Sequence, residues 1–155
     1  MTFKLRNLLQ VFLIILLSSC GFKIANQSEA MGFKIGSIST TGDSRVSYRI
    51  KNNLLPYSKN DSNRTIDLNI KIKKNKTIKE KNINNEVTKY LVSIKAIVNY
   101  GAEENKVFSI TKKGDLTVSN QYSQTLNSEK KIIKSLSESV VEDIIEELLE
   151  RIDDI

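Results

Sequence analysis

The sequence contains no histidine and no tryptophan, and it has a single cysteine and a single proline among its 155 residues. Without histidine, the chain lacks the commonest general base and the commonest metal ligand of proteins. This absence excludes Ser-His-Asp and Cys-His catalysis and argues against a zinc site. Catalysis by carboxylates alone remains open, but no pair of acidic residues stands out by its spacing. We therefore expect a protein that is not an enzyme and that holds neither a metal nor a cofactor.

Long apolar runs are also absent, apart from one near the N-terminus. Residues 8–17 are apolar except for Gln10, and they follow Lys4 and Arg6. A basic start, a short apolar stretch and small residues before a cleavage point are typical of a secretory signal. The stretch is too short to be a typical membrane-spanning helix. The sequence therefore predicts export.

The only cysteine, Cys20, lies at the end of this segment. The run Leu17-Ser18-Ser19-Cys20 resembles the lipobox of bacterial lipoproteins. The resemblance implies transfer of a diacylglyceryl group to Cys20, cleavage before it, and acylation of the new amino terminus, with palmitate as the expected fatty acid. Two or more acyl chains anchor a protein stably, because each buried CH₂ contributes about 0.8 kcal/mol. Gly21 stands where an aspartate typically retains lipoproteins in the inner membrane, so we expect the outer membrane, on its periplasmic side.

These features divide the chain into three parts. We expect a lipoprotein signal peptide over residues 1–19, a lipidated N-terminus and tether over 20–31, and a single domain over 32–155. Positive charge gathers in the first part of the domain: residues 21–126 hold 18 Lys and Arg against nine Asp and Glu, whereas residues 127–155 hold four against nine. A basic body favours anionic partners such as anionic lipid or phosphorylated glycolipid. Export argues against nucleic acid.

The first half of the domain predicts a strand followed by a helix. Residues 33–38 alternate between apolar and polar side chains, as a half-buried strand does. A turn is expected over 40–44, where Asp43 or Ser44 can cap a following helix. That helix is expected to run to about Leu55, because Pro56 ends it.

Three further segments predict the rest of the sheet. Strict alternation over 65–73 predicts a strand with one face in a core and one in water, and 87–100 repeats the pattern. Residues 74–85 between them are polar and basic, which we interpret as a long hairpin tip. A third segment over 106–122 is expected to be interrupted at 112–115, where a glycine indicates a bulge or turn.

The C-terminal segment predicts a long helix over 126–152, with Ser128 as its cap. Its apolar residues recur at the spacing of one wide helical face. They are Ile132, Ile133, Leu136, Val140, Val141, Ile144, Ile145, Leu148, Leu149 and Ile152. Strands in the middle and helices around them predict an α+β fold, in which two helices pack on one face of a small, mostly antiparallel sheet of about four strands.

The order of these elements resembles the lipopolysaccharide-assembly lipoproteins of the LptE type. The resemblance rests on Cys20-Gly21-Phe22 at the anchor, on the paired strands around 68–72 and 90–96, and on the run 122–129 that leads into the last helix. It implies an outer-membrane lipoprotein that assembles with the LptD β-barrel, plugs it, and contacts lipopolysaccharide on its way to the outer leaflet. It also implies that the protein is not an enzyme.

Lysine clusters supply a candidate site for this function. The phosphates and carboxylates of lipopolysaccharide attract cationic side chains. We therefore predict lipopolysaccharide-binding lysines in the hairpin tip and in a second basic pair. They are Lys73, Lys74, Lys76, Lys79, Lys81, Lys112 and Lys113. In an antiparallel sheet both clusters are expected at strand ends. A solvated turn without a ligand is the competing interpretation of the tip.

Three other functions fit parts of the pattern. An accessory or pilotin-type lipoprotein of another outer-membrane barrel or secretion channel shares every feature except the order of the motifs. A lipid-anchored hydrolase would need two carboxylates that converge in a cleft. A lipid carrier would need a hollow apolar cavity, whereas the strict inward alternation predicts a filled core.

Overall fold

The computed structural model describes residues 32–59, 62–101 and 106–151. The predicted signal peptide, Cys20 and the tether lie outside these residues. In chain order the elements are β1 (Lys34–Gly42), α2 (Ser44–Leu54), a 3₁₀ helix η1 (Leu55–Ser58), β2 (Thr65–Lys81), β3 (Val87–Tyr100), β4 (Val107–Thr117) and α3 (Tyr122–Glu150). Within the described ranges, no helix has the length and apolar character needed to span a membrane.

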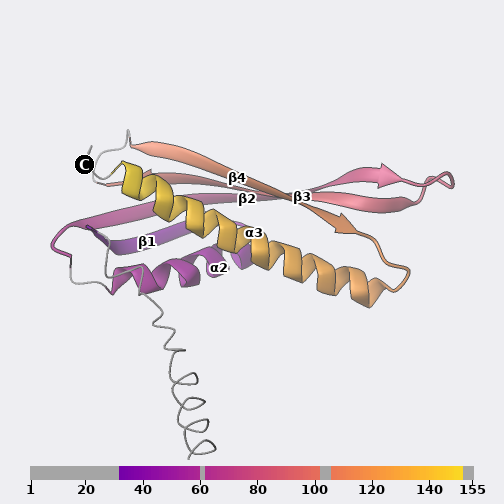
Figure 1. Ribbon diagram of the computed structural model, residues 1–155, viewed down its shortest axis with the longest axis horizontal. Coiled ribbons are helices and arrows are strands. Elements are labelled where there is room, and N and C mark those ends of the chain that lie inside the picture. The colour runs from indigo at the N-terminus through magenta and orange to yellow at the C-terminus, as the bar shows by residue number, and fades with distance from the viewer. Residues whose placement is uncertain (1–31, 60–61, 102–105, 152–155) are drawn as a thin grey trace, which may run out of the picture.

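The four strands form one mixed sheet in the order β1-β2-β3-β4. The pair β1–β2 is parallel, whereas β2–β3 and β3–β4 are antiparallel. Both helices lie on the same side of this sheet (Figure 1). The predicted α+β fold, with two helices on one face of a mostly antiparallel four-stranded sheet, is therefore confirmed.

The face of the sheet that meets the helices forms the core. The even-numbered positions of β2 and β3 are apolar there and almost fully buried. They include Ile66, Leu68, Ile70, Ile72, Val92, Ile94 and Val98, each at most 2% exposed. The helices cover them with Val46, Ile50 and Leu54 of α2 and Leu136, Val140, Ile144 and Leu148 of α3. Burying such a side chain contributes about 1.5–3 kcal/mol, so this face stabilises the fold. The opposite face, which we call the open face, has no described helix over it.

The strand β1 runs further than predicted, and the turn expected over 40–44 is wrong except for its cap. The strand reaches Gly42, whose φ of 108° suits glycine. A Cβ at this position would lie 1.9 Å from the carbonyl oxygen of Ile72, so only glycine fits beside β2. Asp43 then caps α2, because its Oδ1 accepts the Val46 N–H at 3.0 Å.

The hairpin tip expected over 74–85 is also wrong. Strand β2 continues to Lys81 and stays paired with β3, so the connection shrinks to the residues between Lys81 and Val87. The side chain of Asn82 closes this turn by accepting the N–H groups of Asn84 and Glu86. Polar side chains do not end a strand when a neighbouring strand supplies its backbone partners. The far end of β2 and β3 therefore projects as a two-stranded ribbon (Figure 1).

The interruption expected at 112–115 does not occur. Strand β4 pairs with β3 without any register shift from Val107 to Thr117. Gly114 instead makes room for α3, since a Cβ there would come within 2.9 Å of Ile132 Cδ1. The glycine marks a close approach between helix and strand, which is the second common reason for a glycine in a strand.

The last helix begins earlier than predicted, and Ser128 is not its cap. α3 starts at Tyr122, and its N-cap Gln121 makes no side-chain capping bond. The turn before it is held by Thr125, whose Oγ1 accepts the Ser119 N–H at 2.9 Å. The apolar periodicity starts later than the helix itself, which explains the misplaced start. Most of the predicted apolar face is buried, but Leu149 is 41% exposed and Ile152 lies outside the described residues.

Candidate functional site

The structure divides the seven predicted lysines between the two faces of the sheet. Lys74, Lys76 and Lys112 lie on the helix side, because they continue the even-numbered positions of β2 and β4. Each meets a carboxylate: Lys74 lies 3.0 Å from Asp43, Lys76 lies 2.6 Å from Glu129, and Lys112 lies 2.8 Å from Asp143. These three lysines join the sheet to its helices.

The helix-side contacts are more than simple ion pairs. The Nζ of Lys76 also lies 4.5 Å from the centre of the Tyr90 ring, a cation–π contact. Burial disfavours ionisation of Asp43, but hydrogen bonds from Val46 and Lys74, together with the Lys74 charge, hold the pKa of Asp43 below its usual value. The carboxylate that caps α2 is therefore ionised and fixed in place.

Two lysines of the ribbon are also engaged. Lys79 contacts Asp115 of β4 at 2.5 Å, and Lys81 donates to Asn85 Oδ1 at 2.8 Å. Lys79 and Lys81 lie at the end of β2, whereas Lys73, Lys74 and Lys76 lie within the strand. The expectation that both clusters lie at strand ends is wrong for the second cluster. Lys112 and Lys113 lie in the middle of β4, opposite Ile94 and Ser93.

The remaining two lysines, Lys73 and Lys113, lie exposed on the open face. Sequence reasoning missed two neighbours, Lys71 and Lys95, which the sheet brings to the same place. Lys95 of β3 is directly opposite Lys73 of β2, and side chains in that relation have Cβ atoms about 5 Å apart. Lys71 lies two positions along β2, and Lys113 lies diagonally across on β4.

We call these four residues, Lys71, Lys73, Lys95 and Lys113, the lysine face. In the part of the chain that the structure describes, none of them forms an ion pair with a carboxylate. Like charges directly across a pair of strands are destabilising, so Lys73 and Lys95 cost stability unless an anion lies between them. The signal that could have found them is the odd-numbered parity that 71, 73, 95 and 113 share, combined with the strand register.

On the open face, the carboxylate of Asp67 bonds to the backbone and does not pair with a lysine. Asp67 accepts the backbone N–H of Ser37 at 2.6 Å. This backbone hydrogen bond, with a second one from the Ser37 hydroxyl, lowers the pKa of Asp67 below its usual value. Asp67 therefore ties β1 to β2 at the end of the sheet away from the ribbon.

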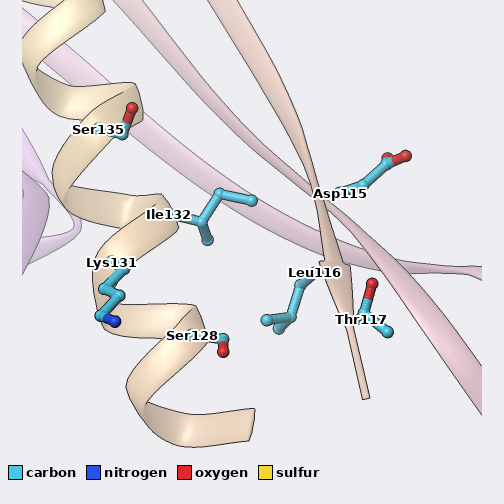
Figure 2. A pocket seen from close by; sticks show the side chains of 7 residues that line it. All are labelled: Asp115, Leu116, Thr117, Ser128, Lys131, Ile132 and Ser135. Carbon is cyan, nitrogen blue, oxygen red and sulfur yellow. The ribbon is translucent and has the colours of Figure 1, made fainter. Parts of the chain in front are cut away.

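A pocket of about 420 Å³ opens between α3 and β4 (Figure 2). Ile132 of α3 and Leu116 of β4 point toward each other across it. The other lining residues are Asp115, Thr117, Ser128, Lys131 and Ser135. The pocket is shallow and partly polar, which makes it unlike the hollow apolar cavity of a lipid carrier.

The chain shares its fold with solved bacterial lipoproteins. Rare lipoprotein B of Shewanella oneidensis is similar with a TM-score of 0.58 over 78% of this chain and 97% of its own, at 10% identity. Lipoprotein B of Nitrosomonas europaea gives 0.60 over 83% and 90%, at 12% identity. A minor lipoprotein of Acinetobacter baumannii gives 0.52 over 75% and 89%, at 11% identity. The chain matches no family model and no curated protein.

Proposed function

We propose that this protein is an outer-membrane lipoprotein, anchored through Cys20 and exposed to the periplasm. It assembles with an outer-membrane β-barrel of the LptD type, plugs it, and assists transport of lipopolysaccharide to the outer leaflet. It has no enzymatic activity. Its fold, shared with bacterial lipoproteins, and the lipobox before Cys20 support the anchored location. The observation that carries the glycolipid contact is the lysine face.

The lysine face changes which residues we assign to the glycolipid. Lys74, Lys76 and Lys112 already neutralise carboxylates inside the protein, so using them for a ligand would break contacts that hold the helices. Lys71, Lys73, Lys95 and Lys113 have no such partners among the described residues. Several ammonium groups close together suit a ligand with several phosphates, because each charge-assisted hydrogen bond is shorter and stronger than a neutral one.

The test of glycolipid contact compares two triple variants of equal charge change. One replaces Lys71, Lys73 and Lys95 with Glu, and the other replaces the exposed, helix-side Lys51, Lys59 and Lys130 with Glu. We expect the first variant to lose at least tenfold in lipopolysaccharide affinity and the second to stay within about twofold. Equal losses would mean that only net charge matters, and unchanged binding in the first variant would remove the lysine face from the function.

The barrel partnership has its own test. The acylated protein is purified from membranes in detergent, and whatever remains bound is identified. A single large barrel of the LptD type is the expected result. Another barrel or a secretion channel would transfer the function to an accessory or pilotin-type lipoprotein. A protein that comes through alone would contradict a stable barrel complex.

A further inference from the structure

The outer edge of β4 offers a regular row of backbone hydrogen-bonding groups. The N–H of Tyr100 donates to the Lys106 carbonyl at 3.1 Å, and the N–H of Val118 donates to the Thr88 carbonyl at 2.9 Å. In an antiparallel pair the bonded positions alternate, so the even-numbered residues of β4 face β3. The odd-numbered residues turn their N–H and C=O groups outward. They are Val107, Ser109, Thr111, Lys113, Asp115 and Thr117.

This edge is suited to pairing with another strand. Over its whole length β4 keeps one register with β3, whereas β1 at the other edge contains a register shift between Ile35 and Ile38. A shift of that kind bends an edge strand and disrupts its ladder. At about 3.4 Å per residue, β4 offers an unbroken edge of roughly 35 Å.

The pocket of Figure 2 lies directly beside this edge. Its lining includes Leu116, whose side chain points to α3, and also Asp115 and Thr117, whose side chains point to the open face. Since these three consecutive residues point to both faces of the sheet and all line the pocket, the pocket extends to the backbone at the edge of β4. A strand added at the edge would place alternate side chains into this space, against Leu116 and Ile132. Peptide-binding domains that extend a sheet use this arrangement, with backbone bonds for affinity and pockets for specificity.

The charged side chains around the β4 edge indicate the charge of the strand that could pair with it. Lys113 is exposed on the open-face side, and Lys131 lines the pocket on the helix side; neither forms an ion pair among the described residues. Lysines on an edge strand discourage pairing with a second copy. They favour a strand that brings its own carboxylates.

We propose that the β4 edge, from Val107 to Thr117, is a docking site for an extended, acidic segment of another protein. The segment adds a fifth strand to the sheet, places apolar side chains in the pocket beside Leu116, and sets a carboxylate against Lys113. This site shares Lys113 with the lysine face, but its main contacts are the backbone of β4 and the pocket on the helix side, so variants of Lys71, Lys73 and Lys95 test the glycolipid contact separately.

The test uses the full acylated protein in detergent and two end-capped decapeptides as probes. One peptide alternates Glu and Val, and the other alternates Lys and Val. We expect the Glu-Val peptide to bind at least tenfold more tightly, and amide exchange at Ser109, Thr111 and Lys113 to slow when it binds. Equal affinity for both peptides, or no change in exchange at these amides, would overturn the proposal.

A matched pair of variants then tests the backbone contact. Thr111→Pro removes an outward N–H at an edge position where proline is tolerated, and Thr111→Val keeps it. The proline variant should lose at least tenfold in affinity for the Glu-Val peptide, whereas the valine variant should bind as the parent does. Equal binding by both variants would contradict strand addition.

A charge-reversal variant tests the proposal independently, in case the proline variant does not fold. Lys113→Glu should reverse the preference, so that the Lys-Val peptide binds better than the Glu-Val peptide. An unchanged preference would overturn the charge argument. If the protein alone sediments as a dimer that Thr111→Pro dissociates, the edge is occupied by a second copy, and the assignment to another protein is wrong.

Discussion

Lysines on the two faces of one sheet have opposite environments in this protein. Lys74 and Lys76 on the helix side each meet a carboxylate within 3.0 Å. Lys73, which directly precedes Lys74 in the sequence, faces Lys95 on the open face instead. Two adjacent lysines therefore have different roles, because their side chains lie on opposite faces of the sheet. Helix-side lysines join the sheet to its helices, and open-face lysines leave their charge for a partner.

The reason for this difference lies in the helices. Asp43 caps α2, and Glu129 and Asp143 belong to α3, so these three carboxylates all reach the sheet from the same side. On the open face, Asp67 is bonded to Ser37 and Asp115 to Lys79. The lysine face is thus left with a surplus of positive charge by the one-sided placement of the helices.

The largest expected effect on stability comes from comparing two single variants that place a carboxylate on opposite faces of β2. Ile70 is fully buried, and its neighbour Asn69 is exposed. We expect Ile70→Asp to unfold the domain, because an unpaired buried carboxylate adds to the loss of an apolar side chain that alone costs about 2–5 kcal/mol. Asn69→Asp should change stability by less than about 0.5 kcal/mol. Ile144→Asp in α3 should behave like Ile70→Asp.

The midpoint of thermal unfolding of the three variants tests this prediction. A midpoint for Ile70→Asp within a few degrees of the parent would contradict the role of this face as the core.

A smaller effect is expected when single lysines are neutralised. Lys76→Met leaves Glu129 without its partner and removes the contact with the Tyr90 ring, so it should cost about 1 kcal/mol. Lys73→Met relieves repulsion with Lys95, so it should be neutral or stabilise by a few tenths of a kcal/mol. Urea unfolding of the two variants compares them. A larger loss for Lys73→Met than for Lys76→Met would reverse the roles we assign to the two faces.

The smallest expected effect is a dependence of stability on acid pH. The folded-state pKa of Asp43 is lowered, so its contribution is fully present above the unfolded value of about 3.9 and is lost as pH falls through the lowered value. Asp43→Asn keeps a good capping residue but removes the charge that meets Lys74. Its stability should therefore fall less steeply than that of the parent as the pH drops below about 4. Urea unfolding at each pH measures the free energy of unfolding of both proteins. An equal fall in this free energy for the parent and for Asp43→Asn would contradict the role of the Asp43–Lys74 pair.

Much of the fold was predictable because alternation within a strand depends only on local sequence. Ile66, Leu68, Ile70 and Ile72 identify the buried side of β2 without any knowledge of what covers it. The extents of β2 and β4 were not predictable in the same way. Their continuations past Lys73 and through Gly114 are polar or lack a side chain, and they remain strands because β3 supplies backbone partners along its whole length.

The candidate site shows the same division. The sequence alone identified a basic region and two of its four open-face lysines, Lys73 and Lys113, because positive charge is a property of composition. It could not identify Lys71 and Lys95 as their neighbours, since these four residues come from three strands and meet only through the register of the sheet.

The sequence by itself determined the apolar face of each strand and helix, a helix cap at Asp43 or Ser44, and the lipobox at Cys20, because each depends on residues a few positions apart. Only the tertiary structure decided which lysines are neutralised and which are free. Lys76 and Glu129 are 53 residues apart in the chain, and electrostatic pairing depends on distance in space. The placement of both helices on one side of the sheet brings those carboxylates to the helix-side lysines and leaves the lysine face to a partner.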